Sequence, residues 1–325
     1  MSVVNSPRPL GDTARSAGQG KVSAAEQPPP LDKTSPRGGG SWPRRLRMAR
    51  QVDLSATVGL LLVAMFVLAA LLAPLIEPHD PLAQDVARRL KPPGFVDASA
   101  GIFLLGTDGL GRDILARVIE GARVSLLVGV GGASISAILG TCLGLTAGYA
   151  SGWWDTVIMR CVDVFQAIPF TILAIAVAVI LGPSLRNVII VLGISSWVNY
   201  ARVVRSETLT QRNGEIVVAA RVIGATHFRI LLRHVLPQVT ASIIVLTSLL
   251  VASMILFEAS LSFLGLGVQP PTPSWGNMVL DGVEPIRVAW WVSFFPGVAI
   301  LLTVMGINLV GDWMRDVLDP RQQSV

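Results

Sequence analysis

Residues 213–237, NGEIVVAARVIGATHFRILLRHVLP, decide how this chain is organised, because they form a polar-flanked segment between two long apolar runs. Within the segment, apolar side chains recur twice at helical spacing: Ile216, Ala219, Ala220 and Ile223, then Phe228, Leu231, Leu232 and Val235. Gly224 can take the positive φ that ends a helix, and Pro237 cannot donate the hydrogen bond that would continue one. The pattern predicts a rigid, bent pair of short helices beside a membrane, each with one face to dock.

Composition identifies the environment of the whole chain. Of the 325 residues, 52% are hydrophobic and 14% are charged, and the mean hydropathy is +0.61. An average soluble domain has about 25% charged residues, so we expect an integral membrane protein. The net charge of +5 would suggest nucleic acid as a partner of a soluble protein. Here the arginines gather at the ends of apolar runs, so membrane lipid is the expected partner and nucleic acid is not.

Hydropathy predicts an all-α, polytopic membrane protein with six transmembrane helices. The first span, at residues 54–76, is longer than the ~20 residues that cross the hydrocarbon. The third should be kinked at Pro169, and the fourth should run past the membrane into the loop at residues 213–237. The other five spans are expected at about residues 124–148, 165–182, 187 onward, 239–257 and 288–311. Small residues four apart predict a packing seam on the second span: Gly132, Ser136, Gly140, Gly144 and Gly148.

Charge and composition also predict the domain boundaries. Residues 1–50 are rich in Pro, Gly and Ser and should form a disordered cytoplasmic tail. Residues 51–123 hold the first span and a long periplasmic loop, residues 124–321 the transmembrane core, and residues 322–325 a short tail. With the N-terminus inside, 18 basic residues fall on inner segments and 8 on outer ones. Both termini and the loop should therefore be cytoplasmic.

Several kinds of chemistry have no signature in the sequence. No Gly-rich phosphate loop occurs, since Gly20-Lys21 lies in the tail and is followed by valine. The three histidines share no helical face with ligands at metal-binding spacing. Cys142 and Cys161 both lie in or beside apolar runs and are expected to be packing residues without a disulfide. We therefore expect no catalytic residue, no cofactor and no metal, and a chain that is not an enzyme.

The quoted loop resembles a known motif. Its Ala219-Ala220, Gly224 and Leu236-Pro237 look like the Glu-Ala-Ala loop of the permeases of bacterial binding-protein-dependent ABC importers. The resemblance implies that the loop plugs into a cleft on an ATPase subunit. One departure is Val218, which stands where that family has an acidic residue. An alternative is a basic amphipathic helix that lies on anionic lipid.

Three further stretches resemble one branch of that family, the C-type permeases of dipeptide, oligopeptide and nickel importers. They are LLGTDGLGRDILARVIEGARVSLLVGV at 104–130, MILFEASLSFLGLGVQPPTPSWGNM at 254–278 and GDWMRDVLDPR at 311–321. The resemblance implies a permease that moves di- or oligopeptides across the bacterial inner membrane. Its expected partners are a homologous second permease, two ATP-binding subunits and a periplasmic or extracellular solute-binding protein. The residues implied in ATPase coupling are Ala219, Ala220, Gly224, Phe228, Arg229, Leu232, Leu236 and Pro237.

Other interpretations stay open at this stage. Glutathione-like peptides or nickel chelates are alternative cargoes of permeases of this kind. A secondary transporter would need coupling-ion groups in broken helices, and only Glu258 comes near that requirement. Glu258 is either a pathway residue or a satisfied partner at a helix end, and we favour the structural role. An intramembrane enzyme would need a nucleophile with its base, and the sequence shows neither.

Overall fold

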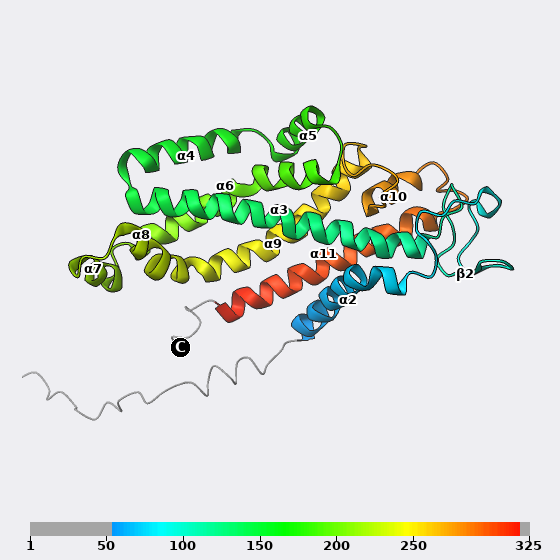
Figure 1. Ribbon diagram of the computed structural model, residues 1–325, viewed down its shortest axis with the longest axis horizontal. Helices are drawn as coiled ribbons and strands as arrows, with labels where there is room; N and C mark the ends of the chain where they lie inside the picture. Colours follow the sequence, from blue (N-terminus) through cyan, green and yellow to red (C-terminus); the bar gives the residue numbers. More distant parts are fainter. Residues whose placement is uncertain (1–53, 319–325) are drawn as a thin grey trace, which may run out of the picture. The chain divides into compact units, whose positions relative to one another are not determined.

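The computed structural model describes residues 54–318, and the predicted tails at residues 1–50 and 322–325 lie outside them. The described part of the chain is mostly helical (Figure 1). The long helices are α2 (Leu54–Ile76), α3 (Ile114–Ala150), α6 (Leu185–Gln211), α9 (Leu236–Phe263) and α11 (Trp291–Leu318). The shorter ones are α4 (Gly152–Ala167), α5 (Phe170–Leu181), α7 (Glu215–Val222), α8 (His227–Ile230) and α10 (Trp275–Asp281).

Five of the described helices are each long and apolar enough to cross a membrane, and the bent pair α4 and α5 raises the number to six if it counts as one span. The predicted all-α membrane fold with six spans is confirmed on that count. Side by side in the bundle, α3 packs along α6, and α11 packs against α2 and α9 (Figure 1). We call the end that carries α7 and α8 the loop end, and the end that carries α10 the hairpin end.

The predicted small-residue seam is confirmed on α3. A Cβ atom added at Gly140 would lie 2.3 Å from the carbonyl oxygen of Trp197, and one at Gly144 would lie 2.7 Å from that of Ala201. Ser136 adds a hydrogen bond across the seam, because its hydroxyl donates to the carbonyl oxygen of Gly193 at 2.7 Å. The two backbones therefore touch along the seam, which fixes α3 and α6 as one rigid unit.

The third span differs from the prediction. A helix already begins at Gly152, and α4 and α5 are bent by 89° around two residues, Ile168 and Pro169. Ile168 is extended, as residues before proline commonly are, and Pro169 has no N–H to bridge the break. The predicted break at Pro169 is therefore confirmed, but the bent pair begins at Gly152 rather than at about residue 165. The start of α4 was not predicted, because Asp155, Arg160 and Asp163 interrupt the apolar run on which the span prediction depended.

Pro237 does not end the second loop helix, and this part of the prediction is also wrong. The chain passes from α8 through a π-helical turn (Leu231–Val235) directly into α9. The Leu236 N–H donates to the carbonyl oxygen of Leu231, one residue further back than in an α-helix. Pro237 stands in the first turn of α9, where a missing N–H costs little. The loop is thus joined rigidly to the fifth span.

At the hairpin end, the chain between α2 and α3 contains a 3₁₀ turn (Val86–Arg88) and the antiparallel strands β1 (Phe95–Asp97) and β2 (Gly101–Phe103), with Phe95 opposite Phe103. Helix α3 begins at Ile114, as the helical spacing of Ile114, Leu115, Val118 and Ile119 predicts, and the side chain of Asp113 caps it by accepting the N–H of Leu115. The second span therefore starts well before the apolar run does.

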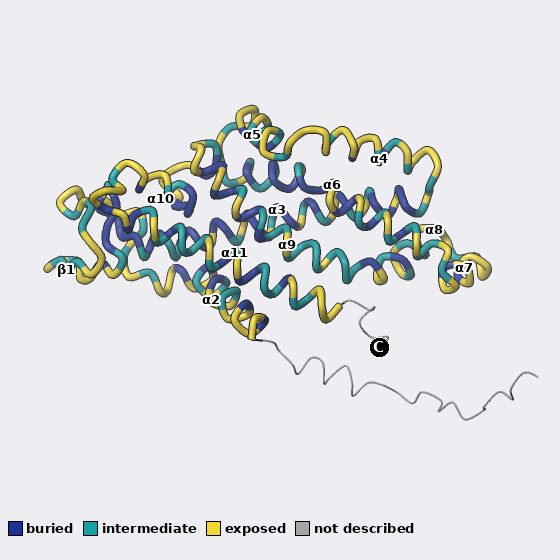
Figure 2. The backbone as a smooth tube through the Cα atoms, turned by 180° about the vertical axis from the view of Figure 1, so that it is seen from behind, coloured by how far each residue is buried: buried dark blue, intermediate teal, exposed yellow. Residues whose placement is uncertain are grey.

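Burial is uneven over the bundle. Buried residues line α3 and α6, whereas α4, α5 and α7 are mostly exposed (Figure 2). One core joins the hairpin ends of α2, α3, α9, α10 and α11, and a second lies under the loop. Cys142 and Cys161 are free, and both are exposed, so the expectation that they pack in the interior is wrong.

Candidate functional site

The backbone of segment 213–237 is bent at Gly224, as the sequence predicts. Helix α7 ends in a Schellman motif, in which the Gly224 N–H donates to the carbonyl oxygen of Arg221 and the Ala225 N–H to that of Ala220, both at 3.0 Å. Gly224 has φ +79°, a left-handed conformation that costs any residue with a Cβ. The angle between the loop helices is therefore set by the backbone of one glycine.

One side of the loop is buried in a local apolar core. Val217 and Ile230 are fully buried, one from each loop helix. Burying an aliphatic side chain stabilises a fold by roughly 1.5–3 kcal/mol, so these contacts hold the loop firmly on the bundle. The whole cluster consists of Val217, Ala220, Ile230, Val235 and Val239 of the loop segment and its continuation, packed on Leu145 of α3 and Val204 of α6.

The other side of the loop is apolar as well, but it is exposed. Val222 and Ile223 at the bend are 82% and 84% exposed, and Phe228 beyond it is 71% exposed. Soluble surfaces seldom gather large apolar side chains this way unless a partner covers them. We call this surface the loop patch, and it consists of Ile216, Ala219, Val222, Ile223, Phe228 and Leu232.

Polar contacts attach the loop to the end of α3. The Tyr149 hydroxyl and His227 Nδ1 are 2.9 Å apart, and the two rings meet edge to face. Arg212, just before α7, donates to the carbonyl oxygen of Gly148 at 3.4 Å and to the hydroxyl of Ser151. Any force on the loop is therefore transmitted to α3 and α6 together.

The structure divides the predicted coupling residues between the two sides of the loop. Ala220 is buried and Leu236 is half-buried, so these two position the loop. Six are exposed: Ala219, Gly224, Phe228, Arg229, Leu232 and Pro237. Val218, at the position of the expected acid, is 46% exposed.

Two buried positions, Val217 and Ile230, were missed by the sequence analysis. Periodicity pointed to the stripe of Ile216, Ala219, Ala220 and Ile223 as the docking face. Because α7 is apolar on both sides, the spacing alone could not show which side packs on the bundle.

Glu258 lies far along α9, at the hairpin end and apart from the loop. It is fully buried, and its Oε1 accepts a hydrogen bond from the Ser262 hydroxyl at 2.7 Å. The same hydroxyl accepts the N–H of Val268, so it joins the end of α9 to the chain that follows. The contacts of Oε1 support the structural interpretation of Glu258, although its Oε2 is buried without a hydrogen-bond partner among the described residues.

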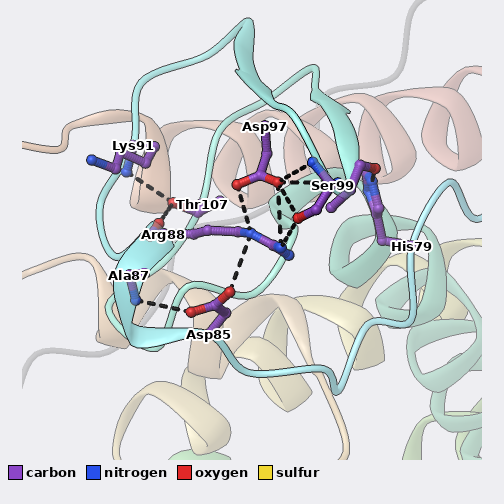
Figure 3. A network of polar contacts seen from close by, with 9 residues as sticks. His79, Asp85, Ala87, Arg88, Lys91, Asp97, Ser99 and Thr107 are labelled. Atoms are coloured by element: carbon purple, nitrogen blue, oxygen red, sulfur yellow. Dashed lines mark hydrogen bonds and ion pairs between the residues drawn. The ribbon is translucent and has the colours of Figure 1, made fainter.

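A second polar cluster organises the hairpin end (Figure 3). Arg88 Nε lies 3.0 Å from Asp97 Oδ2 and 3.3 Å from Asp85 Oδ2. Hydrogen bonds from the hydroxyl and backbone N–H of Ser99 hold the pKa of Asp97 well below its usual range. The cluster closes the turn between β1 and β2 onto the 3₁₀ turn.

His79 connects the start of this segment to the start of α3. Its Nδ1 lies 2.5 Å from Asp113 Oδ2, and its Nε2 donates to the carbonyl oxygen of Ala100 at 2.8 Å. Partial burial lowers the pKa of His79, but the hydrogen bonds to Asp113 and Ala100 outweigh it, so the pKa lies above its ordinary value.

The start of α3 and the chain just before it also contain a buried charge cluster. Asp108 Oδ2 is 2.7 Å from Arg112 Nε and 3.0 Å from Arg117 Nη1, and all three side chains are less than a tenth exposed. Asp281 of α10 completes the cluster, 3.4 Å from Arg112 Nη2. Its ion pairs tie α10 to α3.

Among residues 54–318, no group of three or more His, Cys, Asp or Glu side chains is placed to hold a metal ion. The loop end thus carries an exposed apolar surface, and the hairpin end carries a network of polar groups that bind one another.

Two models of known protein families match this chain. A family model described as "Binding-protein-dependent transport system inner membrane component" matches residues 140–324. A second, "N-terminal TM domain of oligopeptide transport permease C", matches residues 55–93.

Curated relatives match most of the chain. The di/tripeptide transport system permease protein DppC of Pseudomonas aeruginosa is 46% identical over 266 residues, which is 82% of this chain and 88% of that protein. The dipeptide transport system permease protein DppC of Alkalihalophilus pseudofirmus is 40% identical over 300 residues, 91% of this chain and 95% of that protein. The glutathione transport system permease protein GsiD of Escherichia coli is 47% identical over 216 residues, 66% of this chain and 71% of that protein.

Among solved structures, the MetNI methionine ABC transporter in an inward facing conformation is similar in fold. The TM-score is 0.51 at 19% identity, and the match covers 63% of this chain and 97% of that one. At this identity the likeness supports the fold alone.

Proposed function

Because the chain belongs to the family of binding-protein-dependent transport system inner membrane components, we propose that it is the C-type permease subunit of a bacterial importer for di- or oligopeptides. It is a membrane permease rather than an enzyme. The dipeptide permeases among its relatives support the cargo. The observation that carries the coupling role is the loop patch, an exposed apolar surface on a firmly anchored bent helix pair.

In this proposal, ATP is hydrolysed on two separate ATP-binding subunits, and the loop patch inserts into a cleft of one of them. Covering the patch removes apolar surface from water, which favours docking. The loop packs on α3 and α6 and continues into α9, so it moves as one rigid body with these helices. Movement of the ATP-binding subunit would therefore tilt the spans. A homologous second permease completes the passage, and a solute-binding protein delivers the cargo.

The proposed orientation puts the loop end in the cytoplasm and the hairpin end outside. The excess of basic residues on the segments that would be inner supports it. Both termini would then be cytoplasmic, in the inner membrane of a bacterium, with lipid around the outward-facing apolar helices.

The test is reconstitution with the products of neighbouring genes. Vesicles containing this chain, its second permease and the ATP-binding subunits should take up a labelled dipeptide only with ATP and the solute-binding protein. Uptake that continues without the ATP-binding subunits and follows an ion gradient would show a secondary transporter instead.

Glutathione is the second cargo that a specific observation favours, because permeases named for glutathione are 45% and 47% identical to this chain. Competition in the same vesicles separates the two. If unlabelled glutathione blocks dipeptide uptake at lower concentration than the dipeptide itself, the cargo assignment moves to glutathione while the permease role stands.

A further inference from the structure

A polar stripe runs along one exposed flank of α4. Thr156, Arg160, Asp163 and Gln166 follow one another at steps of four, three and three residues, so they lie on one side of the helix, and each is exposed. On α6, Asn199, Arg202 and Ser206 make a similar exposed row at helical spacing. The row on α6 belongs to a candidate span, and the row on α4 belongs to the bent pair of α4 and α5, which is either a broken span or a re-entrant loop.

The two rows meet. Arg202 Nη2 lies 3.6 Å from Asp163 Oδ1, and these side chains are 52% and 58% exposed. Toward the loop end, Asp155 accepts a bidentate contact from Arg205, which fixes the antiparallel register of α4 on α6. The rows therefore form one continuous surface, which we call the polar face: Thr156, Arg160, Asp163, Gln166, Asn199, Arg202 and Ser206.

Contact with lipid would be unfavourable for the polar face. Charged side chains in a span are costly in hydrocarbon and face protein or water. The outward face of α2 shows what a lipid-facing surface of this chain looks like, because it exposes residues such as Leu61, Met65 and Leu71 and no charge. The polar face has the opposite composition.

Reach toward the membrane surface does not explain the polar face. Arginines near a helix end can extend their heads to the headgroups, and Arg202 could do so. Asp163 has a short side chain that cannot. Gln166 and Asn199 lie farther from the loop end than the Asp163 and Arg202 pair does, and their side chains are exposed as well.

The remaining exposed flank of α4 is apolar. It carries Trp153, which is 75% exposed, Trp154, which is 59% exposed, and Val164, which is 63% exposed. Each residue advances an α-helix by about 100°, so the two steps from Val164 to Gln166 turn it by about 200°. The two side chains therefore point about 160° apart. Helix α4 therefore stands at a boundary, with a flank suited to lipid and a flank suited to water.

We propose that the polar face lines the water-filled passage of the importer, and that the Asp163 and Arg202 pair binds the charged ends of a peptide in transit. This rests on the proposed function, since it assumes a zwitterionic cargo. The carboxylate matches the cargo's ammonium group and the guanidinium its carboxylate. A half-exposed pair held by a single contact opens at little cost, which a transient binding site requires.

Cysteine accessibility tests the passage without any transport. In a Cys142→Ser, Cys161→Ser background, the assembled transporter in vesicles carries either Gln166→Cys or, as the matched control, Val164→Cys. A charged thiosulfonate should label position 166 at least about tenfold faster than position 164, because a charged reagent does not enter hydrocarbon. After the membrane is dissolved in denaturing detergent, the same reagent should label both positions, because both thiols can then ionise in water. Equal labelling of the two positions by the charged reagent, or none at 166, would overturn the passage.

Uptake kinetics test the pair. Asp163→Asn should raise the KM for a free dipeptide by about fivefold and leave that for an N-acetylated dipeptide unchanged, because only the free peptide carries the ammonium group. Asp312→Asn, at an exposed carboxylate near the end of α11, is the control. Equal changes for both peptides would refute binding by Asp163. If the unaltered transporter takes up neither peptide, the proposed function fails, whereas the labelling pattern still decides whether the polar face meets water.

Discussion

The two ends of the molecule handle polar and apolar side chains in opposite ways. At the hairpin end, charged groups such as Asp108 and Arg117 are buried and paired with each other. At the loop end, large apolar side chains such as Ile223 and Phe228 are exposed and contact no core. Both arrangements are unfavourable for an isolated chain unless something compensates for them.

The difference lies in where the compensation comes from. The cluster at the hairpin end supplies its own, because Asp108, Arg112 and Arg117 pair with one another or with Asp281 within the chain. The loop patch has none in the described residues, and in the proposed function an ATP-binding subunit supplies it. We infer that the hairpin end is built for stability and the loop end for docking, and this division predicts different phenotypes for mutations at the two ends.

The largest effect is expected from Gly224→Val. A β-branched residue at φ +79° carries a strain of about 1–2 kcal/mol or redirects α8. Since the spans pack elsewhere, the protein should insert and pair with its second permease but lose nearly all peptide uptake and its hold on the ATP-binding subunits. Uptake and co-purification measure the two losses.

Gly297→Val is the matched control for this variant. A Cβ at Gly297 also meets open space, but its backbone lies in α11 without a positive φ. It should retain uptake. Equal loss in both variants would show that the effect comes from added bulk rather than from the bend.

Asp108→Asn should act at the other end and in the other way. It leaves Arg112 and Arg117 buried without their shared carboxylate, which costs roughly 3 kcal/mol or more. The melting temperature of the purified protein should fall by several degrees, while the surviving molecules still bind the ATP-binding subunits. Asp80→Asn, at an exposed carboxylate of the same segment, should leave the melting temperature unchanged. Loss of ATPase binding at full stability would contradict the division between the ends.

A smaller, pH-dependent effect is expected at Glu77. Partial burial, followed by a hydrogen bond that protonated Glu77 donates to the Glu120 carboxylate, raises the pKa of Glu77 to about 7. The folded state therefore holds a proton that the unfolded state loses near pH 4.5, and wild-type stability should fall as the pH rises from about 4.5 to about 7. Glu77→Gln removes this loss.

Melting temperatures of wild type and the Glu77→Gln variant at pH 4.5 and pH 8 test this pH dependence. The Glu77→Gln variant should gain a few degrees over wild type at pH 8 and little or nothing at pH 4.5. Glu284→Gln, at an exposed carboxyl group, serves as the control. A gain that is the same at both pH values would mean that the charge of Glu77 is not the cause.

The smallest effect is expected from Val218→Glu, which places an acid where the family motif has one. Position 218 is about half exposed, and the new carboxylate could pair with Arg221 one turn later. Such pairs contribute about 0.2–0.5 kcal/mol, so ATPase binding should tighten no more than about threefold. A titration of ATP-binding subunits onto the two proteins measures it, and a loss of binding would argue that the docked patch is apolar throughout.

Much of the fold follows from local patterns in the sequence. The first span, the seam at Gly140 and Gly144 and the positive φ at Gly224 are all correct, because each depends on residues close together in the chain. The continuation of α6 to Gln211, beyond the apolar run, is correct for the same reason.

What the sequence analysis missed depends on contacts between distant segments. The start of α4 was missed because Asp155 and Asp163 look like loop residues until their arginines on α6 are known. A proline at position 237 is typical of a helix end, but the π-helical turn at Leu231–Val235 lets the chain continue into α9. The buried side of the loop, with Val217 and Ile230, depends on what α3 and α6 present to it. The docking role of the loop itself stays a prediction.

The most direct test of the central claim is a crosslink from the tip of the loop patch. In the cysteine-free background, Ile223→Cys carries a photoreactive maleimide in membranes that hold the whole transporter, and Gln238→Cys, exposed at the start of α9, is the matched control. On illumination, position 223 should form an adduct with an ATP-binding subunit and position 238 should not. An adduct of position 223 with phospholipid alone, unchanged when the ATP-binding subunits are left out, would contradict the account and show that the loop lies on the membrane surface.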